Sequence, residues 1–323
     1  MAMRADDMID RRRLRRKLTF WRVVALVIAA VGLASAAAWL LGDFGGAAVD
    51  HIAKVRIEGT ITEDEELLER LKRIRESNSV KGVILSIDSP GGTTAGGEAI
   101  FDAVRKLAAD KPVVAQVGTL AASAGYMIAS ASDHIVARKS SIVGSIGVLV
   151  QFPDITGLMD KIGVKLEEVK SSPLKAEPSP FNPTTDEERA MVRSMILDSY
   201  DWFVGLVAER RPLTRSEAAA LADGSIFTGR QALQKKLVDE LGGESEAVGW
   251  LSTKGVSGDL EVVEWKARNG GWFLSSEALA GAVARLVGLP DHGAALFKQF
   301  GGERLFLDGL LSVWQPEKSV WDD

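Results

Sequence analysis

The stretch from Gly118 to Leu149 constrains the fold most, because it joins a strand to a helix through a run of very small side chains. Residues 112–117 (PVVAQV) form an apolar, β-branched run of strand length, and residues 126–131 continue with helical spacing. Between them, Ser123 stands among alanine and glycine. A hydroxyl at that point lies beside the N–H groups of a helix start, as a nucleophile requires. A serine that merely caps the helix is the alternative.

The composition excludes several kinds of chemistry. The 323 residues contain no cysteine, which rules out disulfides, thiolate nucleophiles and Cys-ligated zinc. Only three histidines occur, at His51, His134 and His292, so a histidine-based metal cluster is not expected and a Ser-His-Asp site has few arrangements. We expect neither a metal nor a cofactor.

The N-terminal region predicts a membrane anchor. Residues 23–41 (VVALVIAAVGLASAAAWLL) carry no charge, and as a helix they would extend roughly 28 Å, close to the thickness of the bilayer hydrocarbon. The basic residues before this run place the N-terminus in the cytoplasm and the rest of the chain outside. A cleaved signal peptide is the competing interpretation, because small residues end the run. The length of the apolar run favours an uncleaved single-pass anchor.

The net charge of −5 hides an asymmetry between the two ends of the chain. Residues 1–22 carry eight basic and three acidic side chains, which leaves 31 basic and 41 acidic side chains for the remainder. An acidic exported domain has no electrostatic footprint for nucleic acid, so no nucleic-acid partner is expected. Membrane topology explains the basic cluster.

The order of elements predicts an α/β fold with a mainly parallel sheet. Strands over 51–59, 80–88 and 112–117 alternate with helices, a pattern typical of parallel strands joined by crossovers. Further strands are expected over 134–137, 142–150 and 165–171, followed by a proline-broken loop and two helices that open with capping boxes at Thr185 and Thr214.

The turn Ser89-Pro90-Gly91-Gly92 follows the second strand. Adjacent glycines at the carboxyl end of a strand let backbone N–H groups face a cleft, as half of an oxyanion hole or a phosphate cradle would require. An ordinary turn is the simpler interpretation. A phosphate loop is disfavoured, because no Gly-Lys-Ser/Thr follows.

Four features occur in order: an N-terminal anchor, DSPGG, AASAGYMIAS…VGSIGVL, and VKSSPLKAEPSPF. Together, over roughly residues 50–245, they resemble the short form of the bacterial signal peptide peptidases of the SppA type. The resemblance implies a ClpP/crotonase-like fold of repeated ββα units. The expected organisation, in chain order, is a basic cytoplasmic N-terminus over 1–22, a transmembrane anchor over 23–41, a linker over 42–50, a protease domain over 51–250 and a C-terminal extension over 251–323.

The resemblance also implies the site residues. Ser123 corresponds to the nucleophile, Lys175 to the general base and Ser145 to the hydroxyl that orients the lysine, while the N–H groups of Gly92 and Ala124 would form the oxyanion hole. This chain has Ser-Ala-Gly at the nucleophile where the family often has Ser-Gly-Gly. Independently of the family, a lysine acts as a base only in its neutral form, which burial and the lack of a carboxylate partner favour.

The residues leave a histidine base as the other option. His134 would be that base, although it follows Ser123 closely, at the expected start of a strand, and is better interpreted as a surface polar residue. We interpret Asp88 and Tyr126 as structural, the first stabilising a turn and the second packing or lining the cleft.

The family resemblance implies that the substrates are remnant signal peptides and other membrane-proximal peptides, cleaved outside the cytoplasm. It also implies a ring-like homo-oligomer in which neighbouring protomers share each active site. Two other functions stay open. One is a crotonase-type acyl-CoA enzyme, which export and the lack of paired catalytic carboxylates disfavour. The other is a non-enzymatic membrane scaffold on the same fold.

Overall fold

The computed structural model describes residues 17, 20–33, 49–267 and 311–313, and the chain divides into two compact units, residues 1–50 and 51–323. The elements of the second unit, in chain order, are β1 (His51–Ile61), α2 (Glu65–Glu76), β2 (Val80–Thr93), α3 (Thr94–Ala108), β3 (Val113–Ala122), α4 (Ala124–Ala131), β4 (His134–Ala137), β5 (Ile142–Gly144), α5 (Thr156–Ile162), α6 (Asp186–Arg210), α7 (Arg215–Ala220), β6 (Ile226–Thr228), α8 (Gly229–Gln234), β7 (Glu240–Leu241), α9 (Glu244–Thr253), β8 (Val262–Glu264) and β9 (Leu311–Val313).

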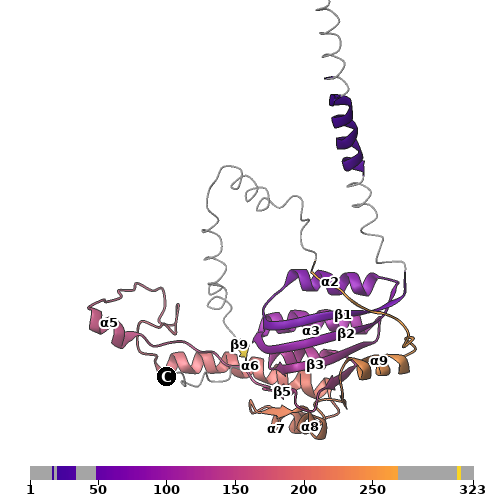
Figure 1. The fold of residues 1–323 in the computed structure, drawn as a ribbon. Helices are drawn as coiled ribbons and strands as arrows, with labels where there is room; N and C mark the ends of the chain where they lie inside the picture. The colour runs from indigo at the N-terminus through magenta and orange to yellow at the C-terminus, as the bar shows by residue number, and fades with distance from the viewer. Residues whose placement is uncertain (1–16, 18–19, 34–48, 268–310, 314–323) are drawn as a thin grey trace, which may run out of the picture. The chain divides into compact units, whose positions relative to one another are not determined.

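The described strands form one mainly parallel sheet in the order β6-β5-β3-β2-β1-β8 (Figure 1). In addition, β4 pairs in parallel with both β3 and β7. Of the described strands, only β6 and β9 run antiparallel to their neighbours, β5 and β2. The predicted α/β fold with a mainly parallel sheet is therefore confirmed. The sheet also extends past the boundary expected at residue 250, because β8 pairs with β1.

Helices cover both faces of the sheet, as a parallel sheet requires. One face packs against α2, α3, α4 and the end of α6 in a large apolar core. The other face is covered by α9, where Leu251 and Val256 pack on Ile52, Ile84 and Val114 of three adjacent strands. Side chains of opposite faces alternate along each strand, so burial on both faces explains why the strands read as continuous apolar runs.

Strand β2 is longer than predicted. It continues through Ser89-Pro90-Gly91-Gly92 to Thr93, where the sequence indicated a turn after Asp88. The extra residues pair with the end of β1, after a shift of register between Glu58 and Thr60. A Cβ on Gly92 would lie 1.8 Å from the carbonyl oxygen of Ile61. A glycine is therefore required at position 92, because β1 approaches too closely to leave room for a side chain.

Two other predicted strands are wrong in extent. The strand expected over 142–150 ends at Gly144, because Gly144 and Ser145 both take positive φ and turn the chain away. Residues 165–171, expected as a strand, are irregular. The capping boxes at Thr185 and Thr214 are confirmed, and they begin α6 and α7.

The first unit contains a helical segment over residues 20–33 whose side chains are almost all exposed. This segment covers part of the predicted anchor, and residues 34–41 lie outside the described residues. Within the part of the chain that is described, no helix has both the length and the apolar character needed to cross a membrane.

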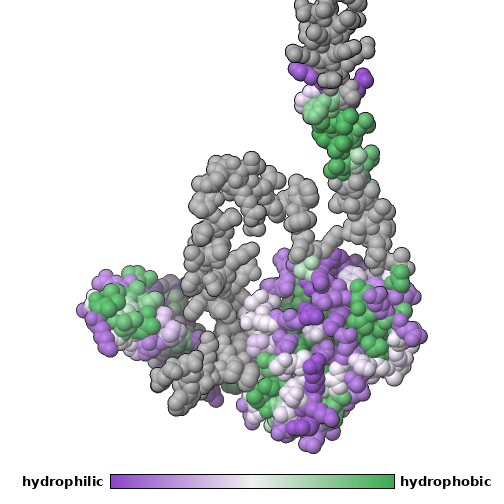
Figure 2. Space-filling view, in the orientation of Figure 1, coloured by the Kyte–Doolittle hydropathy of each residue, from purple (hydrophilic) through white to green (hydrophobic). Residues whose placement is uncertain are grey.

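A segment over residues 147–199 extends from the sheet and carries α5 and the first half of α6 (Figure 1). None of these residues belongs to either described core cluster. Apolar side chains nevertheless gather on its surface, as Figure 2 shows for the part around α5. The large exposed ones are Leu149, Leu158, Ile162, Val164, Leu166, Val169, Phe181, Met191, Met195 and Leu197.

The contact at Gly92 gives a stability prediction. Gly92→Ala would force the backbones of β1 and β2 apart, and we expect the free energy of unfolding to fall by about 3 kcal/mol. Gly157→Ala is the matched control, because a Cβ on this helical glycine meets nothing within 4 Å. Urea denaturation of the full chain measures both. Equal midpoints for the two variants would contradict the close contact.

Candidate active site

Ser123 occupies the single residue between β3 and α4. It has φ 57° and ψ −120°, a backbone conformation that glycine adopts far more readily than serine. Its N–H donates to the carbonyl oxygen of Gly144 over 2.8 Å, and its own carbonyl accepts from the N–H of Met127 over 2.9 Å. The side chain makes no capping hydrogen bond, so the helix-cap interpretation of this serine is wrong.

Ser145 lies beside Ser123 because of the sheet register. Ala122 pairs with Gly144 at the ends of β3 and β5, and the residues that follow these strands are Ser123 and Ser145. Ser145 also has a positive φ, 52°, and its N–H donates to the carbonyl of Ser225 over 2.7 Å. Both serines are buried. The structure thus brings together two of the predicted site residues.

Gly92 and Ala124 lie on the elements that flank Ser123. β2 is the neighbour of β3, with Ser89 paired to Ala121, so Gly92 lies at the same carboxyl edge of the sheet. Ala124 is the first residue of α4, where N–H groups have no acceptor within the helix. Strand β9 runs antiparallel along Gly91–Thr93, with Ser312 opposite Gly92. This edge of β2 therefore accepts an extended main chain.

The small residues around Ser123 serve internal packing. A Cβ on Gly97 would lie 3.1 Å from the Cβ of Ala124, and one on Gly125 would lie 3.0 Å from the carbonyl oxygen of Ser89. Sequence reasoning assigned this smallness to substrate approach. The structure shows that it also lets α4 pack closely on α3 and β2.

Buried polar contacts hold α4 in place. The Tyr126 hydroxyl donates to the carbonyl of Leu237 over 2.8 Å, and burial raises the pKa of this phenol above its ordinary value. At the other end of α4, Arg105 donates to the carbonyl of Ala131 and Arg210 to that of Ser130. Cations at a helix C-terminus also interact favourably with the negative end of the helix dipole. The structural role predicted for Tyr126 is confirmed.

The other residues considered in the sequence have structural contacts. Asp88 accepts from the N–H groups of Thr119 and Leu120, which confirms that it stabilises a turn. His134 stacks on Trp250 and lies 3.2 Å from Glu240. Because His134 pairs with Val114 at the start of β3, nine residues before Ser123, it lies at the opposite end of that strand from Ser123. His134 is not the base for Ser123 within one chain.

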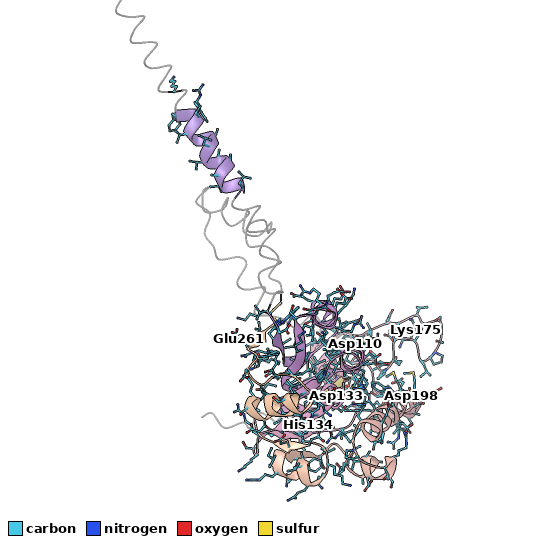
Figure 3. The ribbon with its side chains drawn as sticks, turned by 90° about the vertical axis from the view of Figure 1, so that its right-hand side faces the viewer. Asp110, Asp133, His134, Lys175, Asp198 and Glu261 are labelled. Atoms are coloured by element: carbon cyan, nitrogen blue, oxygen red, sulfur yellow. The ribbon has the colours of Figure 1, made fainter. Side chains whose placement is uncertain are left out.

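Lys175 lies on the projecting segment, where Figure 3 labels it. Its N–H closes a turn onto the carbonyl of Ser172 over 3.2 Å, and its side chain is exposed. Among the described residues, no hydrogen bond or ion pair joins its ammonium group to Ser123 or to any carboxylate. The burial expected for this lysine is therefore not supplied by the described residues of its own chain.

Sequence reasoning missed a polar cluster around Lys175. The Lys170 ammonium pairs with Glu168 over 2.5 Å and also with Glu177, whose side chain is only 2% exposed. The side chain of Asn182 donates to the same Glu177 carboxylate over 3.0 Å. The hydrogen bonds to Glu168 and Glu177 raise the pKa of Lys170. The bond from Lys170 lowers the pKa of Glu177. The opposite charges at 170 and 177, flanking Lys175, were the available signal.

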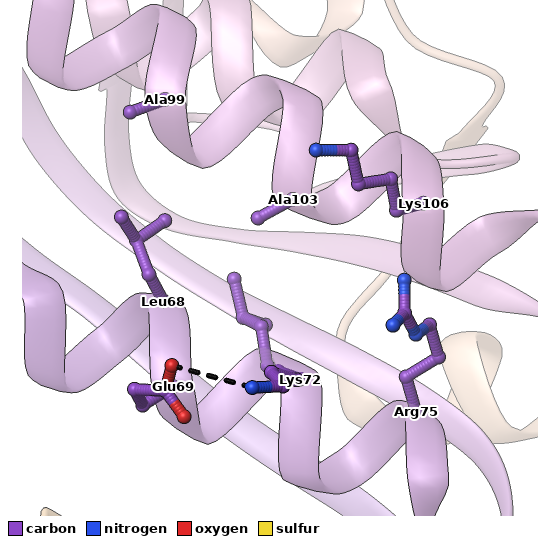
Figure 4. A pocket seen from close by; sticks show the side chains of 8 residues that line it. Leu68, Glu69, Lys72, Arg75, Ala99, Ala103 and Lys106 are labelled. Carbon is purple, nitrogen blue, oxygen red and sulfur yellow. Dashed lines mark ion pairs between the residues drawn. The ribbon is translucent and has the colours of Figure 1, made fainter.

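A hollow of about 500 Å³ lies elsewhere, between α2 and α3 (Figure 4). Lys72, Arg75 and Lys106 surround it, and Lys72 lies 3.6 Å from Glu69. It contains no nucleophile and none of the site residues. Among the described residues, no group of three or more His, Asp or Glu side chains could hold a metal ion.

A buried serine on a strained turn between a strand and a helix, beside a helix start, is the geometry of a serine hydrolase nucleophile. The strain supports this assignment, because sparsely populated backbone conformations concentrate at active sites. The fold and the site thus define a hydrolytic α/β enzyme.

Comparison with known proteins identifies its family. Peptidase family S49 matches residues 105–256, and Clp protease matches residues 50–143. A protein of Enterococcus faecium that carries the provisional name signal peptide peptidase SppA is 32% identical over 274 residues, which cover 79% of each chain. The chloroplastic serine protease SPPA of Arabidopsis thaliana is 32% identical over 227 residues, 65% of this chain and 33% of that one.

A provisionally named protease of Methanocaldococcus jannaschii is 40% identical over 195 residues, 60% of this chain and 63% of that one. The chain thus spans just under two thirds of the archaeal relative and about a third of the plant relative. It belongs to the SppA family of peptidases, family S49, and is a serine peptidase with a mixed α/β fold of the ClpP-like kind.

The backbone of Ser123 gives a prediction that separates strain from chemistry. We expect the free energy of unfolding of Ser123→Gly to exceed that of Ser123→Ala by about 1 kcal/mol, because glycine adopts the positive φ without strain and alanine does not. Both variants lack the Ser123 hydroxyl, so the comparison isolates the backbone. Thermal unfolding of the two full chains measures the difference. An alanine variant as stable as the glycine variant would contradict the strain.

Proposed function

We propose that this chain is a membrane-anchored serine endopeptidase that uses a Ser/Lys dyad to degrade remnant signal peptides after their release from preproteins. Ser123 is the nucleophile, Lys175 the general base and Ser145 the hydroxyl that orients the lysine. The N–H groups of Gly92 and Ala124 form the oxyanion hole. The observation that carries the proposal is the strained Ser123 between β3 and α4, with Ser145 in register beside it.

The reaction follows from these roles. Neutral Lys175 takes the proton of Ser123 as Oγ attacks the peptide carbonyl carbon, and the oxyanion is held by the two N–H groups. The C–N bond then breaks, and the lysine returns the proton to the leaving amine. Water, deprotonated by the same lysine, hydrolyses the acyl-enzyme and frees Ser123.

We propose that the lysine of each site comes from a neighbouring protomer of a ring-like homo-oligomer. Two observations support this arrangement. Lys175 is exposed on a segment outside the core, and that segment carries a large set of exposed apolar side chains. Exposed apolar surface of this extent marks a protein–protein contact. A neighbour that covers the segment would also supply the burial that favours neutral lysine.

The substrate would bind as an extended strand. An antiparallel peptide that displaces β9 from the edge of β2 at Gly91–Thr93 would pair beside Gly92 in the same way. The E. faecium relative, whose name specifies a signal peptide peptidase, supports signal peptides as the substrate class. The uncharged run over 23–41 would anchor the chain in the cell membrane, with the N-terminus in the cytoplasm and residues 51–250 outside as the protease domain.

A scaffold without catalysis is the second candidate, and a serine-reactive probe separates it from a protease. A fluorophosphonate should label the wild-type chain but not Ser123→Ala. Absence of labelling in a correctly assembled wild type would favour the scaffold.

The base assignment has a direct kinetic test. We expect the full chain to hydrolyse a synthetic signal peptide, and Lys175→Ala to lower kcat/KM at least about a hundredfold, as loss of a general base does. Oligomer size and unfolding temperature of the variant serve as controls. Equal hydrolysis by both proteins would remove Lys175 as the base.

Shared sites predict rescue by mixing. Ser123→Ala and Lys175→Ala are each inactive, but co-assembled chains should regain up to about a quarter of wild-type activity, because random neighbours pair an intact serine with an intact lysine in that fraction of sites. Peptide hydrolysis after joint refolding measures the rescue. Mixed oligomers without activity would contradict sites shared between protomers.

A further inference from the structure

We propose that Lys170 is a positioning residue for this reaction: it engages the buried Glu177 carboxylate and thereby leaves the base Lys175 without an anionic partner. The inference rests on the proposed role of Lys175 as general base. It concerns a residue five positions away, which has no contact with the reacting atoms.

The geometry around Glu177 presents a problem for a lysine base. Glu177 follows Lys175 by two residues, and Cα atoms that far apart are separated by at most about 7 Å. A lysine side chain reaches that far, so the carboxylate is an available partner for the Lys175 ammonium. A carboxylate pair stabilises the charged form of a lysine and would suppress its action as a base.

Lys170 occupies the Glu177 carboxylate instead. Its ammonium pairs with Glu177 and with Glu168, and Asn182 donates to the same Glu177 oxygen, Oε1. These are all the charged contacts of the cluster among the described residues. The Lys170 ammonium thus offsets two carboxylates, of Glu168 and Glu177, that lie within seven residues of Lys175.

Glu177 would recruit another cation if Lys170 were absent. Its second oxygen, Oε2, is buried and has no hydrogen-bond partner of normal geometry among the described residues, although the N–H of Ser179 also helps to lower the pKa of this carboxylate. A buried carboxylate with an unfilled acceptor and no cation carries a large desolvation cost. Lys175 is the lysine closest to Glu177 in sequence. It also lies within the turn that the N–H of Glu177 closes by donating to the carbonyl of Leu174 over 3.4 Å.

The test is the pH dependence of signal-peptide hydrolysis by the full chain. In Lys170→Gln, we expect the acidic limb of kcat/KM to move to higher pH by about one unit, because Glu177 then stabilises the protonated base. Activity near neutral pH should fall about tenfold as a consequence of that shift. Lys170→Gln combined with Glu177→Gln should return the limb to its wild-type position, and Lys170→Arg should leave it there.

Lys165→Gln is the matched control, because it removes the same charge from the same segment without freeing a carboxylate. A limb that stays at its wild-type pH in Lys170→Gln would overturn the proposal, whatever the loss of rate. A double variant as shifted as the single one would also overturn it. Lys175→Ala, measured in parallel, tests the proposed function separately, and full activity there would overturn both.

A second measurement does not depend on turnover. The rate at which acetic anhydride acetylates Lys175, followed by mass spectrometry across pH, reports the neutral fraction of that amine. The same upward shift in pH is expected for Lys170→Gln relative to wild type and Lys165→Gln. Identical acetylation profiles in the three proteins would overturn the proposal.

Discussion

The hydrogen bond from the N–H of Ser123 to the carbonyl of Gly144 is the contact on which the site depends. It is the last link of the parallel pairing between β3 and β5, and it holds Ser123 at positive φ just where α4 begins. That one link sets Ser145 beside Ser123 and brings both to the sheet edge where Gly92 ends the pairing of β1 and β2. The sheet register, more than any side-chain contact, therefore assembles the serine half of the site.

The two halves of the proposed dyad lie in different surroundings, the serines in the buried sheet and the lysine on the projecting segment. Ser123 and Ser145 are buried in a sheet covered by helices on both faces, with α4 fixed by Tyr126. Lys175 lies on a segment outside the core, held locally by the cluster of Lys170, Glu177 and Asn182. A strained serine needs a rigid surrounding to maintain it. Under the proposed mechanism, a lysine supplied to a neighbouring protomer needs exposure before assembly, and the two surroundings agree with these two requirements.

Much of the fold could be predicted because apolar runs and capping boxes are local signals. The strand before Ser123, the helix after it and the start of α6 at Thr185 follow from them. The continuation of β2 through Gly92 could not be predicted, because Pro-Gly-Gly is typical of turns and the residue that pairs with Gly92 is Ile61, 31 residues earlier. The site residues were proposed from motifs. The Lys170–Glu177 pair was missed, because the opposite charges at 170 and 177 do not by themselves show that the carboxylate is buried.

The most direct test of the shared site is the rate of Ser123 labelling by a fluorophosphonate as the full chain is diluted through its assembly range. If the lysine comes from a neighbouring protomer, labelling per chain should fall in step with the oligomeric fraction measured on the same samples, and Lys175→Ala should label slowly at every concentration. A dissociated chain that labels as fast as the assembly, with Lys175 intact, would contradict the shared site.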